Sequence, residues 1–153
     1  MAGIQLRVET PALEAAIARL VDLERAADDP ELLATAGAFA ESAARRRITE
    51  TKTAADGTPW VPWAESTRAR RASQHSLLVF RGHLRDSIAY VVEATREQVA
   101  VGSNLVYAAH QHEGSRDQGR AGAIPARPFL GLSTSETGAL ERIIVAYFEE
   151  VVQ

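Results

Sequence analysis

His110, His112 and Glu113 lie within four residues of one another, and their side chains are of types that bind transition metals. Residues i and i+2 of a helix point about 200° apart, so the two histidines cannot share one helical face. On a strand they would share a face, but the sequence contains no obvious second ligand cluster. We therefore expect no metal and no cofactor, and we place this group among structural or interface residues.

The common signatures of an enzyme are absent from the sequence. The chain has no cysteine, which excludes a thiolate nucleophile and a disulfide framework. It has neither a Gly-x-Ser-x-Gly elbow nor a glycine-rich phosphate-binding loop. The carboxylate pairs Asp28/Asp29 and Glu149/Glu150 fall at the ends of expected helices, where solvated surface explains them. We expect a protein that is not an enzyme; the enzymatic alternative predicts a metal-dependent activity that is lost in His110→Ala or His112→Ala.

The formal charge of −3 conceals an uneven distribution along the chain. Residues 1–44 carry a net charge of −5, residues 45–86 carry +5 and residues 87–153 carry −3. Candidates for contacts with a phosphate backbone or a neighbouring subunit are Arg45, Arg46, Arg68, Arg70 and Arg71. For Arg45 and Arg46 a simpler explanation is a position near a helix C-terminus, where cations offset the helix dipole.

Residue patterns predict an α+β fold in a single domain over residues 1–153. Alternation indicates a short strand at residues 3–9, and proline at the first helical position predicts helices from Pro11 to about Ala27 and from Pro30 to about Ile48. The second helix is rich in alanine, so we expect it to approach its neighbour closely.

From residue 87 the apolar period changes to two, which predicts an antiparallel hairpin over about residues 87–102. Its first strand is apolar on both faces, so we expect helices or a partner subunit to cover both. Ser133 and Glu136 form a capping box that opens a final helix. We expect the N-terminal helices and this C-terminal helix to pack on the small sheet. Acids are mildly unfavourable at a helix C-terminus, so Glu149 and Glu150 either meet an arginine cluster of a neighbouring subunit or lie at a frayed end.

Two loops, residues 49–63 and residues 114–123, are rich in turn-forming residues, and we expect them to be mobile or interface-forming. Trp60 and Trp63 lie in the first loop and are either anchors on the core or contact residues. Ser66 or Thr67 is expected to cap a short arginine-rich helix that ends near residue 73.

Five short motifs in a fixed order carry a resemblance to a known family. They are Asp56-Gly-Thr-Pro-Trp60, Leu84-x-x-Ser-Ile88, Val101-Gly102, Tyr107-Ala-x-His-Gln-x-x-Gly114 and Ile124-Pro-Ala-Arg-Pro-Phe-Leu-Gly131. Over about residues 30–150 the chain resembles the phage virion morphogenesis family, the tail-completion-like family of Mu-like and related tailed phages and prophages. That family usually has Thr or Ser before the glycine at position 82, where this chain has Arg81.

The resemblance implies a non-enzymatic virion protein that acts in tail completion or head–tail joining. Such proteins form a ring at the neck, often of six copies, around the DNA channel, in the manner of a tail terminator. The implied partners are further copies of itself and other neck, connector or tail-tube proteins, while DNA passes through without sequence-specific binding. The implied location is the neck or tail region of the virion, reached by assembly in the host cytoplasm and without a membrane.

The resemblance, together with the tryptophan pair, marks a set of interface or fold-defining residues: Trp60, Trp63, Tyr107, His110, Gln111, Gly114, Pro125, Arg127, Pro128 and Phe129. Core packing is the simpler role for Tyr107 and Phe129. Arg127 is the better interface candidate, because the neighbouring prolines stiffen the segment and fix the direction of its guanidinium. The alternative function is a DNA-binding accessory protein of a phage or prophage that uses residues 45–86, and it predicts duplex binding that falls steeply with salt.

Overall fold

The computed structural model describes residues 11–27, 29–115 and 123–152. These residues form an α+β fold with one two-stranded antiparallel sheet, which confirms the expected class. The elements are α1 (Pro11–Ala27), α2 (Pro30–Arg46), α3 (Glu65–Arg68), α4 (His83–Ser87), β1 (Ile88–Glu93), β2 (Gln98–Ser103), α5 (Ala108–Glu113) and α6 (Thr134–Val152). The strand expected at residues 3–9 and most of the loop at 114–123 lie outside the described residues.

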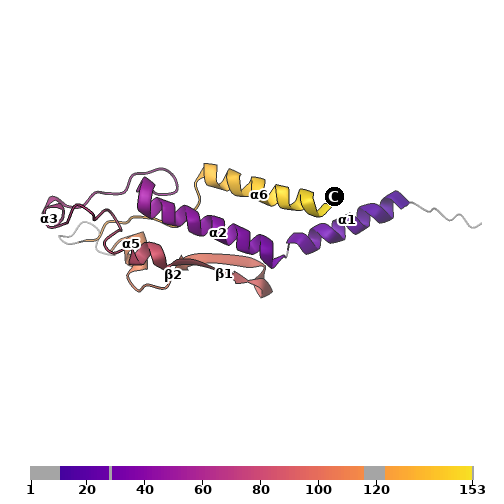
Figure 1. The fold of residues 1–153 in the computed structure, drawn as a ribbon, viewed down its shortest axis with the longest axis horizontal. Helices are drawn as coiled ribbons and strands as arrows, with labels where there is room; N and C mark the ends of the chain where they lie inside the picture. Colours follow the sequence, from indigo (N-terminus) through magenta and orange to yellow (C-terminus); the bar gives the residue numbers. More distant parts are fainter. Residues whose placement is uncertain (1–10, 28, 116–122, 153) are drawn as a thin grey trace, which may run out of the picture.

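Helix α2 is the central element of the fold. The β1–β2 hairpin packs along one side of it, and α6 runs along another side (Figure 1). Helix α6 also packs against α1, which continues beyond the N-terminal end of α2. The C-terminal helix therefore packs on α1 and α2. Helix α3 and its neighbouring loops lie at the end of the molecule opposite α1 (Figure 1).

The antiparallel hairpin forms where it was predicted, and its register pairs Ile88 with Ser103 and Tyr90 with Val101. Its inner side carries Ile88, which is fully buried, and faces α2. On the outer side Val91 is 61% exposed, and Ala89 is exposed as well. Helices of the chain therefore cover the inner face of this strand and leave its outer face open, and the alternative that a partner subunit covers the outer face stays a prediction.

Both ends of α6 are tied to α2. At its N-terminus the capping box forms as predicted: Ser133 N donates to Glu136 Oε2 (2.8 Å) and Glu136 N donates to Ser133 Oγ (3.2 Å). Glu136 also accepts hydrogen bonds from Arg46 and Arg47, each at 2.7 Å. At the other end the Tyr147 hydroxyl donates to Asp29, and this bond raises the pKa of Tyr147 to about 12. Asp29 is the residue that caps α2, by accepting from Glu31 N.

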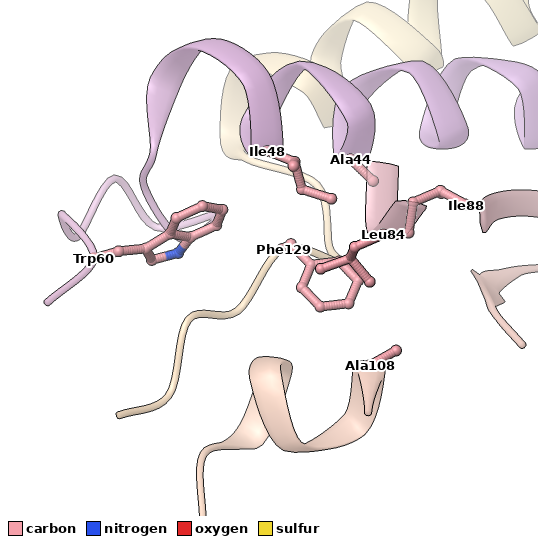
Figure 2. Packing of buried hydrophobic residues seen from close by; sticks show 7 residues of the cluster. All are labelled: Ala44, Ile48, Trp60, Leu84, Ile88, Ala108 and Phe129. Atoms are coloured by element: carbon pink, nitrogen blue, oxygen red, sulfur yellow. The ribbon is translucent and has the colours of Figure 1, made fainter. Parts of the chain in front are cut away.

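The core joins segments that are distant in the sequence (Figure 2). Phe129 lies between two helices, α2 and α5 (Figure 2). Ala44 faces it from α2 and Ala108 faces it from α5. Ile48, Ile88 and Phe129 are at most 1% exposed. Packing of Phe129 in the core thus fixes the extended segment at residues 123–130. The core role that we expected for Phe129 is confirmed.

Two helix boundaries differ from the sequence expectation. Helix α3 begins at Glu65 after an Ala64 N-cap and ends at Arg68, so Ser66 and Thr67 lie inside it and its length is shorter than predicted. Helix α2 continues into one π-helical turn, Arg47–Thr51, which ends at Lys52 in a left-handed conformation (φ 55°). The Lys52 ammonium donates to the carbonyls of Ile48 and Leu77, and these bonds offset the cost of that backbone conformation.

Candidate functional site

Three hydrogen bonds from two buried side chains fasten the first loop to the proline-rich segment. Trp60 is 5% exposed, and its indole Nε1 donates to the Pro128 carbonyl (3.0 Å). Arg127 is 6% exposed, and its Nε and Nη2 both donate to the Val61 carbonyl (3.0 and 2.9 Å). Trp60 is therefore a core anchor. The interface role expected for Arg127 needs correction for the single chain, because its guanidinium is turned inward onto backbone.

Helix α5 holds the other side of the same segment. His112 Nδ1 accepts a hydrogen bond from Phe129 N (3.2 Å), and its ring lies edge-on to the Phe129 ring at 5.0 Å. The Gln111 carbonyl accepts from Arg127 N (3.0 Å). Burial lowers the pKa of His112, against the opposing effect of Glu113. The helix ends at Gly114, which has φ 81°, a conformation that favours glycine.

An open groove of about 1120 Å³ lies on the surface that these contacts build. Its walls come from within residues 61–71, 76–84 and 123–127, together with Tyr107 and Gln111. Among the described residues that line it, none is acidic, whereas Arg71 and Arg81 are exposed cations. The groove is therefore a surface of mixed apolar and polar side chains with two exposed cations, the type of surface that binds a partner.

Aromatic rings and arginines stack at one wall of the groove. The Arg71 guanidinium lies 5.4 Å from the centre of the Trp63 ring and 5.2 Å from that of Phe80, and Arg81 lies 5.5 Å from Phe80. The Phe80 ring also packs on His75 at 4.4 Å. These contacts hold Phe80 in place although it is 53% exposed.

Tyr107 and Trp63 belong to the groove. Tyr107 is 44% exposed and lines it, so the simpler role of core packing is wrong for this residue. Trp63 is half-buried on its wall, and Pro125 lines it as well. His110 is exposed on α5 and does not line the groove. The structure therefore brings most of the marked residues either to the groove or to the anchor beneath it.

The first arginine cluster is used inside the chain. Arg45 donates to the Ile88 carbonyl (2.8 Å) and pairs with Glu41 (2.9 Å), while Arg46 pairs with Glu136. Both side chains therefore have partners in their own chain but stay nearly half exposed, and their contacts with phosphate or a neighbouring subunit stay a prediction. Arg68, Arg70 and Arg71 are exposed near the groove.

The described residues contain no group of three His, Cys, Asp or Glu side chains placed to hold a metal ion. None of the helices in the described part of the chain is long and apolar enough to cross a membrane.

The sequence profile of the phage virion morphogenesis family matches residues 8–149. The chain belongs to this family. The match includes all of α2, α6 as far as residue 149, and every residue that lines the groove. No curated protein and no solved structure matches the chain with significant similarity. Membership of a virion morphogenesis family gives the chain a structural role in building a phage particle.

Sequence reasoning missed several residues that organise the site in this family member. Arg47 is 4% exposed and bonds to the Phe129 and Gly131 carbonyls as well as to Glu136, yet in the sequence it is only the third arginine of a run. Phe80 and Arg81 line the groove but lie in residues 74–84, which show no regular pattern. In the sequence, residues 74–84 stood out at a single position: Arg81 stands where the family usually has Thr or Ser.

Proposed function

We propose that the chain acts in tail completion or head–tail joining, as a ring of identical subunits at the neck of the virion around the DNA channel. The protein acts by assembly and not by catalysis. Its partners are further copies of itself and a neck, connector or tail-tube protein.

The observation that supports this proposal best is the clustering of exposed apolar side chains. Single exposed apolar residues are normal on a monomer, whereas clusters mark surfaces that another molecule covers. One cluster lines the groove and includes Val61, Phe80 and Tyr107, which are 53%, 53% and 44% exposed. Another lies on α1, at the opposite end of the molecule (Figure 1). A chain with separate exposed apolar surfaces at its two ends is suited to be a subunit that contacts a neighbour on each side.

The charge distribution also suits a ring through which DNA passes. Two of the five arginines that suggested DNA binding, Arg45 and Arg46, pair with Glu41 and Glu136 of the same chain. With a formal charge of −3 the chain has no excess of cations to grip a phosphate backbone. A ring of such subunits allows DNA to move along its axis.

Deletion of the gene in its own phage tests the function. We expect electron micrographs of the lysate to show DNA-filled heads and separate tails, with joined particles restored when the wild-type chain is supplied. Joined, infectious particles in the absence of the gene would contradict the proposal.

A further inference from the structure

Helix α1 leaves an apolar stripe uncovered. Ile17, Leu20 and Val21 are 52%, 65% and 38% exposed, and they share one helical face by their spacing. The opposite face is turned to the chain, since Leu23 is half-buried and Ala26 is 6% exposed. Within the described residues, the stripe therefore does not serve the packing of α1 on its own chain.

Acidic side chains accompany this stripe. Glu14 lies three residues before Ile17 and Glu24 four residues after Leu20, which places both carboxylates on the same face as the apolar side chains. Both are exposed. Helix α1 thus presents an apolar stripe with two acids beside it and with one cation, Arg25, four residues after Val21.

The groove has the complementary character. Its exposed apolar side chains include Val61, Phe80 and Tyr107, its exposed cations are Arg71 and Arg81, and none of the described residues that line it is acidic. Arg127 fixes the Val61 backbone and the Arg71 stack fixes Phe80, so the surface exists before a partner binds. Less ordering is then needed on association.

Helix α3, whose Ser66 and Thr67 line the groove, lies at the end of the molecule opposite α1 (Figure 1), so α1 does not fill the groove of its own molecule. A contact between two different surfaces on identical chains repeats from one copy to the next, and it closes a ring when the rotation between neighbours allows. We propose that α1 of one copy docks in the groove of the next copy, with Ile17, Leu20 and Val21 on the groove's apolar side chains and Glu14 and Glu24 toward Arg71 and Arg81. This inference rests on the proposed ring and names the surfaces that build it.

Three substitutions at positions of similar exposure test the docking in the full chain. Leu20→Asp alters α1, Phe80→Asp alters the groove, and Val145→Asp on α6 is the matched control; the native side chains are 65%, 53% and 54% exposed. Light scattering after size exclusion should show wild type and Val145→Asp as assemblies. Leu20→Asp and Phe80→Asp should each weaken association at least about 30-fold and elute as monomers, with circular dichroism like that of wild type.

Mixing the two defective variants gives the decisive result. The Leu20→Asp chain keeps an intact groove and the Phe80→Asp chain keeps an intact α1, so an equimolar mixture should form a dimer with one chain of each. A mixture that stays monomeric overturns the docking, and so does a Phe80→Asp chain that still dimerises alone through paired α1 helices. If Leu20→Asp still forms the same ring as wild type, the docking is overturned, whereas the proposed ring function is not. A wild-type chain that stays monomeric at millimolar concentration overturns both.

Discussion

Gly37 of α2 faces the ring of Tyr90 on β1 without space for a side chain. A Cβ atom at position 37 would lie 2.6 Å from Tyr90 Cδ2 and 2.7 Å from a methyl carbon of Val99. The small residues of α2 predicted a close approach to a neighbouring element, and that element is the hairpin. The contact at Gly37 sets the distance between the central helix and the hairpin.

Gly37→Ala should therefore destabilise the protein, by about 1–3 kcal/mol, because the new methyl group forces the hairpin away from α2. Gly138→Ala on α6 is the matched control, since its Cβ would meet only Arg142 Nη1 at 3.7 Å. In a helix that substitution is expected to stabilise by up to about 1 kcal/mol. Urea unfolding of the two variants measures both signs, and a gain in stability for Gly37→Ala would contradict the packing described.

Glu136→Gln should remove the partner of a buried cation. Arg47 is 4% exposed and its Nη2 donates to Glu136 Oε2 at 2.7 Å, so loss of the carboxylate leaves a buried charge without its counter-ion. We expect a loss of about 3–5 kcal/mol in the free energy of unfolding. Arg46→Gln is the control, because Arg46 is 48% exposed and its pair with Glu136 is worth less than about 1 kcal/mol. Equal losses in both variants would be the contrary result.

The fold should become less stable as the pH falls, because His112 becomes protonated. Burial lowers the pKa of His112 from 6.5, and its Nδ1 must stay unprotonated to accept from Phe129 N. The folded state therefore binds fewer protons than the unfolded state, so this stabilisation is complete above pH 6.5 and is lost as the pH falls through the lowered pKa. His112→Asn keeps an acceptor that does not titrate, and it should lose less stability than wild type between about pH 7 and pH 5.

His110→Asn is the control for this experiment, because His110 is exposed on the same helix. Parallel pH profiles for wild type and His112→Asn would rule out the role given to the buried imidazole.

Arg127→Gln should lower stability before it affects assembly. The substitution removes two hydrogen bonds from a charged group to the Val61 carbonyl, and we expect a loss of about 1.5–3 kcal/mol. Trp60→Phe, which removes the single bond to the Pro128 carbonyl, should cost about 1 kcal/mol. Thermal unfolding compared with the oligomer mass checks the order of events. If Arg127→Gln weakens assembly and leaves stability unchanged, Arg127 is an interface residue and not an internal anchor.

The sequence predicted the features that depend on near neighbours. The capping box needs only Ser133 and Glu136, three residues apart, and Pro11 and Pro30 mark helix starts through their own backbone geometry. The hairpin followed from alternation alone. Each of these patterns is local, so residue types and spacing are enough to predict it.

The contacts that build the groove are not local, and many of them end on backbone. Arg127 donates to the Val61 carbonyl, 66 positions away, and a carbonyl gives no signal in the residue types of its segment. Arg47 and Glu136 are 89 positions apart. The exposure of Tyr107 likewise depends on which segments surround it. These features follow from the tertiary arrangement and could not be predicted from spacing.

Electron microscopy of the purified full chain, combined with mass measurement of the same particles, tests the central claim most directly. A single closed ring with an open centre wide enough for duplex DNA, and with a mass that is a whole multiple of 16.5 kDa, is the result we predict. Open filaments, or compact dimers without a central opening, would contradict a ring around the DNA channel.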